Sequence, residues 1–135
     1  MFWCGFNWAF CGQSKTNDVN SKANFVLLAF ANIQSDGSVL VDDANYPTTL
    51  QNNWKASGKK VLISVGGASG NWSSAFASNL SISAFVTTLS GAVQRYNLDG
   101  VDLDIEYYGA TPRTVANMII KLKKLLGTKL LMVSP

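Results

Sequence analysis

The sequence predicts an α/β fold with a parallel sheet, because short apolar runs alternate with stretches of helical periodicity. The chain has 135 residues, enough for one hydrophobic core and too few for two. Hydrophobic residues make up 47% of the chain and charged residues 14%, a composition typical of a globular domain. No low-complexity segment or linker interrupts the alternation, so residues 1–135 are interpreted as one domain.

Four apolar runs have the length of strands. They comprise residues 25–31, 60–65, 101–105 and 129–133, and a weaker candidate comprises residues 2–8. Runs that are apolar on both faces are typical of parallel strands covered on both sides. Right-handed crossover connections are therefore expected between them.

Helices are predicted in the intervening segments. Residues 49–57, closed by Gly58, form a short candidate. A longer helix is expected to begin at an N-cap residue, either Ser81 or Ser83. Its apolar face carries Phe85, Leu89, Val93 and Tyr96.

The final predicted helix has a clear start and end. Thr111 is the expected N-cap, Pro112 occupies the first helical position, and Gly127 ends the helix. Its apolar face is expected to carry Val115, Met118, Leu122 and Leu125.

Composition excludes several classes of function. The chain contains no histidine, which excludes Ser-His-Asp and Cys-His catalysis and histidine metal sites within it. The net charge of +3 comes from scattered basic residues, so no nucleic-acid groove is expected. The longest apolar run, residues 25–31, is far shorter than the ~20 residues of a membrane helix. Cys4 and Cys11 either pair or remain free, and no signal peptide is visible.

The most informative segment is residues 98–108, which read LDGVDLDIEYY. It holds four of the eight acidic residues, including the single glutamate, Glu106. In a strand, Asp102, Asp104 and Glu106 point to one face and the apolar residues to the other. Because carboxylates in a row repel one another, this arrangement does not stabilise the fold. If one proton is shared along the row, the outermost acid can stay protonated. The row therefore predicts general-acid chemistry.

Two alternatives stay open at this point. The segment could be a solvated edge strand, although its other face is uniformly apolar. Asp102 and Asp104 could also hold magnesium or manganese, whereas an EF-hand loop is excluded by the position of the glycine.

A second motif, Ser64-Val-Gly-Gly67, ends the preceding predicted strand. Taken alone, it is an ordinary glycine turn after a strand. It lies one β/α unit before the acidic strand, and this position favours its being part of the same functional site.

Together these motifs resemble those of glycoside hydrolase family 18. The run of residues 99–106 is similar to the DGxDxDxE signature, and residues 64–67 are similar to the SxGG motif. Residues 131–135 are similar to the fifth strand of the family, and residues 5–8 are loosely similar to the first. The resemblance implies a (β/α)8 TIM barrel, here incomplete with about five β/α units, since a whole barrel takes ~250 residues.

The resemblance also implies a function, namely retaining hydrolysis of chitin or N-acetylglucosamine oligosaccharides assisted by the N-acetyl group of the substrate, without a cofactor or metal. Glu106 would be the acid, Asp104 would hold the N-acetyl group, and Asp102 would share a proton with Asp104. Ser64, Gly66, Gly67, Trp72 and Tyr107 would support or contact the sugar.

The remaining expectations also depend on the resemblance. An extracellular location is expected, with no nucleic-acid or membrane partner. The alternative function is a non-catalytic carbohydrate-binding or inhibitor-like relative, favoured by the short chain. The 135-residue chain alone is expected to show little activity.

Overall fold

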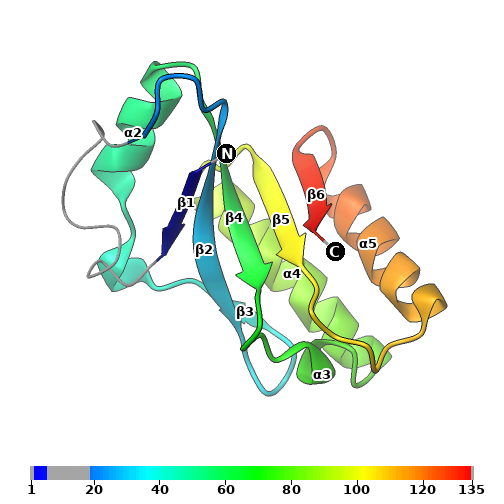
Figure 1. Ribbon diagram of the computed structural model, residues 1–135. Helices are drawn as coiled ribbons and strands as arrows, with labels where there is room; N and C mark the ends of the chain where they lie inside the picture. Colours follow the sequence, from blue (N-terminus) through cyan, green and yellow to red (C-terminus); the bar gives the residue numbers. More distant parts are fainter. Residues whose placement is uncertain (1, 6–18, 135) are drawn as a thin grey trace.

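The computed structural model describes residues 2–5, by their backbone, and residues 19–134. Five strands form a sheet whose neighbours along the path are all parallel. In spatial order these are β1 (Phe2–Gly5), β2 (Phe25–Ile33), β4 (Lys60–Gly66), β5 (Gly100–Asp104) and β6 (Leu130–Ser134). The short β3 (Val39–Leu40) pairs antiparallel with β2. Figure 1 shows the parallel strands side by side in this order.

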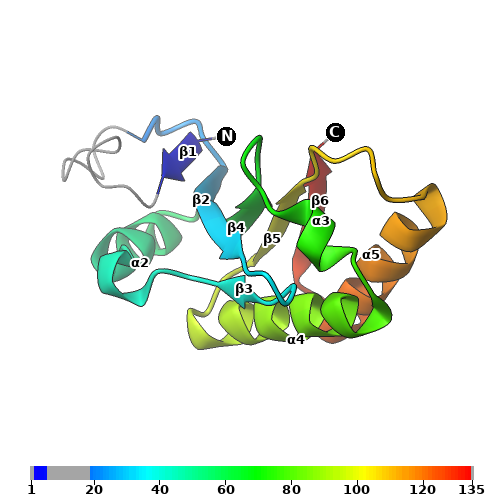
Figure 2. The same ribbon diagram turned by 90° about the horizontal axis from the view of Figure 1, so that it is seen from below.

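Helices fill the crossovers between the parallel strands. The 3₁₀ helix η1 (Asp43–Asn45) and α2 (Thr48–Ala56) lie between β2 and β4. The short α3 (Trp72–Ala75) and the long α4 (Asn79–Arg95) follow β4, and α5 (Pro112–Leu126) follows β5. Figure 2 shows α2, α4 and α5 arranged around one side of the curved sheet. The described residues thus form successive β/α units of an incomplete barrel.

The apolar core lies between the sheet and these helices. Every second residue of β4 and β5 points into it, where α4 and α5 contribute large side chains. Its centre comprises Val61, Ile63, Val65, Val101, Leu103, Phe85, Leu89, Met118 and Leu122. Burying a side chain of this size stabilises the fold by roughly 1.5–3 kcal/mol, so this layer fixes the strands that carry the acids.

The opposite face of the sheet forms a second buried layer. Leu62 and Ser64 of β4 pair with Gly100 and Asp102 of β5, and paired residues in a parallel sheet point to the same side. Leu27, from β2, extends this layer. Asp102 is therefore buried on the interior face, away from the helices.

The predicted architecture is confirmed, and the observed strands differ from the predicted ones by at most two residues at their described ends. The Thr111 cap is also confirmed, since its hydroxyl accepts a hydrogen bond from the Thr114 N–H at 3.2 Å. Residues 6–8, at the end of the predicted first strand and in the segment compared with the first strand of the family, lie outside the described residues. So does Cys11, and the Cys4 side chain is not described.

Two helix predictions need correction. The N-cap of α4 is Ser78, whose hydroxyl accepts from the Ser81 N–H at 3.0 Å, and neither Ser81 nor Ser83 caps it. In α5 the buried face passes through Leu126, while Leu125 is about half exposed. Residues three and four positions after Leu122 both lie near its face of the helix, so periodicity does not separate Leu125 from Leu126, and packing at the end of the helix buries only Leu126.

Candidate active site

The acidic row lies at the carboxyl end of β5 and becomes more exposed along the chain. Asp102 is fully buried, Asp104 is partly exposed, and Glu106 is exposed. The strand ends at Asp104, so Glu106 lies on the segment that follows it. The strand pattern therefore places the first two carboxylates, and the chain beyond the strand places the third. The interpretation of this segment as a solvated edge strand is wrong, since β5 is an interior strand paired on both sides.

Asp102 accepts a hydrogen bond on each carboxylate oxygen. The Ser64 hydroxyl of β4 donates to Oδ2 at 2.7 Å, and the Ser134 hydroxyl of β6 donates to Oδ1 at 3.0 Å. A buried carboxylate needs such partners, because burial without them is costly. The two neighbouring strands thus hold Asp102 in a fixed orientation.

The carboxyl group of Asp104 binds its proton more tightly than an ordinary aspartate does. Partial desolvation raises the pKa of Asp104 above its ordinary value, and the negative charges of Glu106 and Asp102 raise this pKa further. The alternating acids predict that a shared proton lies on the outermost acid, whereas the raised pKa belongs to the middle one, Asp104.

The main chain of Asp104 is held by the turn after β4. Its carbonyl oxygen accepts hydrogen bonds from the Gly67 N–H at 3.1 Å and from Nε1–H of Trp72 at 3.0 Å. These two donors fix the end of β5, where the acids project.

Gly66 and Gly67 lie at positions where a side chain would clash with neighbouring atoms. Both have positive φ angles, 113° and 73°. A Cβ added to Gly66 would lie 2.2 Å from the Asp104 carbonyl oxygen, and one added to Gly67 would lie 2.9 Å from the Phe30 ring. The SxGG motif therefore lets the β4 turn pack directly against β5.

The structure corrects the expectation that Trp72 stacks on sugar. Its side chain is only 1% exposed, and its ring packs against Phe76 and Phe85 at centroid distances of 5.7 and 5.5 Å. A buried ring offers no open face to a pyranose. Trp72 instead supports the carbonyl of Asp104.

Tyr107 stands at the end of the same aromatic stack. Its ring lies nearly parallel to Phe76, with centroids 6.0 Å apart, and it remains partly exposed. Its neighbour Tyr108 is fully exposed. Tyr107 therefore retains surface that a ligand can contact.

Sequence analysis assigned no role to three residues of this site. Phe30 lies against the Gly67 turn, and Gly100 allows β6 to approach, since an added Cβ would lie 2.3 Å from the Leu130 carbonyl oxygen. Ser134 is the second hydroxyl on Asp102. Its position at the end of a predicted strand was the only available signal, because the register between β5 and β6 cannot be read from sequence.

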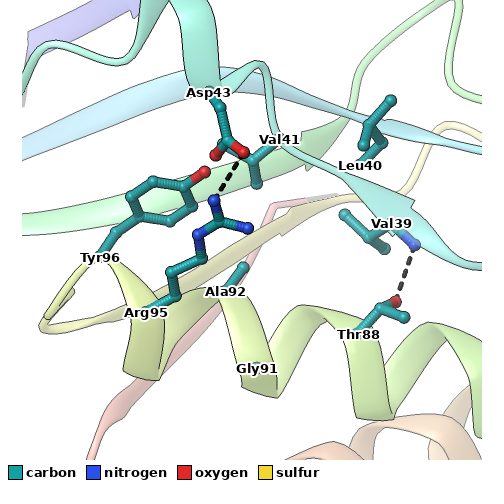
Figure 3. Close-up of a pocket in the computed structure, with 9 residues that line it drawn as sticks. All are labelled: Val39, Leu40, Val41, Asp43, Thr88, Gly91, Ala92, Arg95 and Tyr96. Atoms are coloured by element: carbon teal, nitrogen blue, oxygen red, sulfur yellow. Dashed lines mark hydrogen bonds and ion pairs between the residues drawn. The ribbon is translucent and has the colours of Figure 1, made fainter.

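A cavity of about 230 Å³ lies elsewhere, between the β3–η1 segment and α4 (Figure 3). Its rim carries an ion pair between Arg95 and Asp43 at 2.7 Å, with both side chains exposed. None of the acids of the row lines it. This cavity is therefore separate from the candidate active site.

Within residues 2–5 and 19–134, no group of three or more His, Cys, Asp or Glu side chains is arranged to hold a metal ion. In the same residues, no helix has the length and apolar character needed to cross a membrane.

Comparison with known proteins gives the family. Residues 3–133 match the glycosyl hydrolases family 18. Over 89 residues the chain is 33% identical to Endochitinase 37 from Trichoderma harzianum, a match that covers 62% of this chain and 26% of that protein. The chain therefore belongs to glycosyl hydrolases family 18.

Solved structures show the same fold. A chitinase A from Streptomyces coelicolor aligns with a TM-score of 0.78 and 26% identity, covering 99% of this chain and 48% of the other. The chitinase-like agglutinin RobpsCRA from Robinia pseudoacacia aligns with a TM-score of 0.81 and 19% identity, covering 98% and 45%. The chain thus spans less than half the length of either structure, and its fold matches that of the family's TIM-barrel chitinases.

Proposed function

We propose that the protein hydrolyses the β-1,4 linkages between N-acetylglucosamine units in chitin or chito-oligosaccharides. Family membership supports a glycosidase. The observation that carries the proposal is the graded row of Asp102, Asp104 and Glu106 at the open end of β5, with the exposed Glu106 close enough to raise the pKa of Asp104. An exposed acid beside a carboxyl group with a raised pKa suits proton transfer to a bound glycan.

In the proposed reaction the substrate supplies the nucleophile. The Glu106 carboxyl group donates its proton to the glycosidic oxygen while the bond from that oxygen to the anomeric carbon breaks. The N-acetyl carbonyl oxygen attacks the anomeric carbon and forms an oxazolinium intermediate. Water then attacks the same carbon and gives a proton to the Glu106 carboxylate. The anomeric configuration is retained, because the carbon is inverted twice.

The neighbouring groups position the N-acetyl group. Asp104 accepts a hydrogen bond from its N–H and stabilises the positive charge that develops on the ring. Asp102 supports Asp104 from below and is itself held by Ser64. Tyr107 offers its exposed surface to a sugar ring, while Gly66 and Gly67 let the β4 turn pack closely enough to shape the rim.

The test is Glu106→Gln in the full-length protein. The amide has the shape of the acid but cannot donate the proton, so hydrolysis of a fluorogenic chito-oligosaccharide should fall at least ~100-fold while oligomer binding persists. Proton NMR of the first product should show the retained β-anomer. Near-normal turnover in the variant, or an inverted product, contradicts the proposal.

The metal alternative has its own test. If Asp102 and Asp104 held magnesium or manganese, dialysis against EDTA would abolish hydrolysis, and adding the ion back would restore it. We expect the activity to be unchanged by EDTA, because the row acts here through protons.

A second candidate function is sugar binding without hydrolysis. The similarity to a chitinase-like agglutinin shows that the fold alone does not decide between the two. Retention of Glu106 favours the enzyme. Binding of chito-oligosaccharide by the unmodified protein without release of product would favour the lectin. An extracellular location also remains a prediction from the family.

A further inference from the structure

Ser134 is a hydroxyl beside the acidic row that the proposed reaction does not yet use. It lies at the end of β6, paired in register with Asp104, but its hydroxyl donates to the deeper Asp102. Ser64 reaches the other oxygen of the same carboxylate from β4. Asp102 is thus clamped from both neighbouring strands.

Two donated hydrogen bonds favour the charged form of a carboxylate over the neutral form. Asp102 is fully buried, so bulk water does not contact its carboxylate. A negative charge on the inner carboxylate in turn favours the neutral form of the next acid in the row. The raised pKa of Asp104 agrees with this arrangement, since the negative charge of Asp102 is one of its causes.

Among the described residues of β4 and β6, no charged side chain lies beside the Asp102 carboxylate. The residues of β4 and β6 that share the interior face beside Asp102 are Leu62, Ser64, Met132 and Ser134, and none of them is charged. The charged groups that raise the pKa of Asp104 come from its own segment, namely Glu106 and Asp102. Among the described residues, the orientation of Asp102 thus depends on the two hydroxyls.

We propose that Ser134 is a positioning residue that, together with Ser64, holds Asp102 as a doubly accepting carboxylate and so keeps the proton of the row on Asp104. This inference rests on the proposed function. It assigns the last strand of the described chain a part in controlling protonation.

The test compares Ser134→Ala with Ser134→Thr in the full-length protein. Alanine removes the donor, whereas threonine keeps a hydroxyl. The exposed Ser21→Ala is the matched control, because it makes the same chemical change far from the row. The kinetic measurement is the pH dependence of kcat and KM on a chito-oligosaccharide.

For Ser134→Ala we expect kcat to fall roughly 10-fold with KM nearly unchanged, as when an outer hydrogen-bond partner of an active group is lost. The acidic limb of the profile should move to higher pH by about 1 unit, the size expected for loss of one hydrogen bond to a charged group. The expected direction follows because Asp102, with one donor fewer, takes up a proton earlier as the pH falls. Ser134→Thr should restore both quantities, and Ser21→Ala should change neither.

A measurement without substrate separates this inference from the proposed function. With aspartate labelled by carbon-13 at the side-chain carboxyl, NMR follows the titration of Asp102 directly, and the Asp102→Asn variant assigns its signal. If the protein hydrolyses nothing but the Asp102 signal titrates at higher pH in Ser134→Ala, the inference stands and the proposed function fails. Titration curves that coincide in Ser134→Ala and the unmodified protein overturn the inference, whatever the activity.

Discussion

Aspartates lie at both ends of β5, and the two ends differ in the charged partners that surround these aspartates. Just before the strand begins, Asp99 accepts a hydrogen bond from the Val61 N–H at 2.9 Å. The Nζ atoms of Lys55 and Lys60 each lie 3.9 Å from its other oxygen. At the other end, the described residues form no ion pair to Asp104 or Glu106.

The difference separates a structural acid from functional ones. Asp99 joins β4 to β5, and its charge is compensated by two lysines. The acids at the far end are left uncompensated, and the result is the raised pKa of Asp104. Groups with such perturbed pKa values gather at functional sites more often than elsewhere. Replacing acids at the two ends should therefore affect different properties.

The largest effect is expected for Asp104→Asn, which should lower kcat at least ~100-fold, because an amide, unlike the carboxyl group of Asp104, cannot ionise to balance the positive charge of the intermediate. The fold should persist, since the main-chain carbonyl that Gly67 and Trp72 contact is unchanged. Steady-state kinetics and circular dichroism on the same preparation test both statements. Activity within a few-fold of the unmodified protein would remove Asp104 from the mechanism.

The next effect concerns the turn that supports the functional end. Gly66→Ala would place a Cβ 2.2 Å from the Asp104 carbonyl oxygen at a φ of 113°. We expect a loss of roughly 2–3 kcal/mol in the free energy of unfolding, measured by urea titration. The control is Gly91→Ala in α4, where an added Cβ meets nothing within 4 Å. That variant should be at least as stable as the unmodified protein, because alanine favours a helix. Equal stability of both variants would show that the turn tolerates a side chain.

The contrast between the two ends could be predicted only in part from sequence. The apolar runs located the strands, and the alternation in residues 101–104 placed Asp102 on the interior face, as the structure shows. The pattern was extended too far, however, because the strand ends at Asp104. Nothing local to the sequence marks that end, since Ile105 continues the alternation.

The partners of the acids were harder to predict. The hydrogen bond from Ser134 to Asp102 joins residues 32 positions apart, and it depends on the pairing of β6 with β5. The exposure of Trp72 likewise depends on α3 folding back over the end of β4, which buries the ring against Phe76 and Phe85. Long-range register and tertiary packing, which composition and periodicity do not encode, decided both cases.

At the structural end, Asp99→Ala should lower the free energy of unfolding by about 1–2 kcal/mol, because the Val61 N–H loses its acceptor and two lysines lose their partner. Asp99→Asn keeps an acceptor and removes only the charge, so its loss should be smaller. Urea titration measures both variants. The kcat and KM of both variants should match those of the unmodified protein. A fall in kcat without loss of stability would contradict the assignment of Asp99 as a purely structural acid.

The smallest effect is a pH dependence of stability at Asp104. The raised pKa means that the folded state binds this proton more tightly than the unfolded state does. The resulting stabilisation is fully present below the ordinary aspartate value near 4 and is lost as the pH rises through the raised value. Asparagine cannot lose a proton, so the Tm of Asp104→Asn should exceed that of the unmodified protein increasingly from about pH 4 toward pH 7. Because solvent screens a partly exposed group, the difference at pH 7 should be only on the order of 1 °C. Thermal denaturation between pH 3.5 and 7 tests it, with Ser21→Ala as the control. A constant or shrinking difference over this range would mean that the charges of Asp102 and Glu106 do not raise the proton affinity of Asp104.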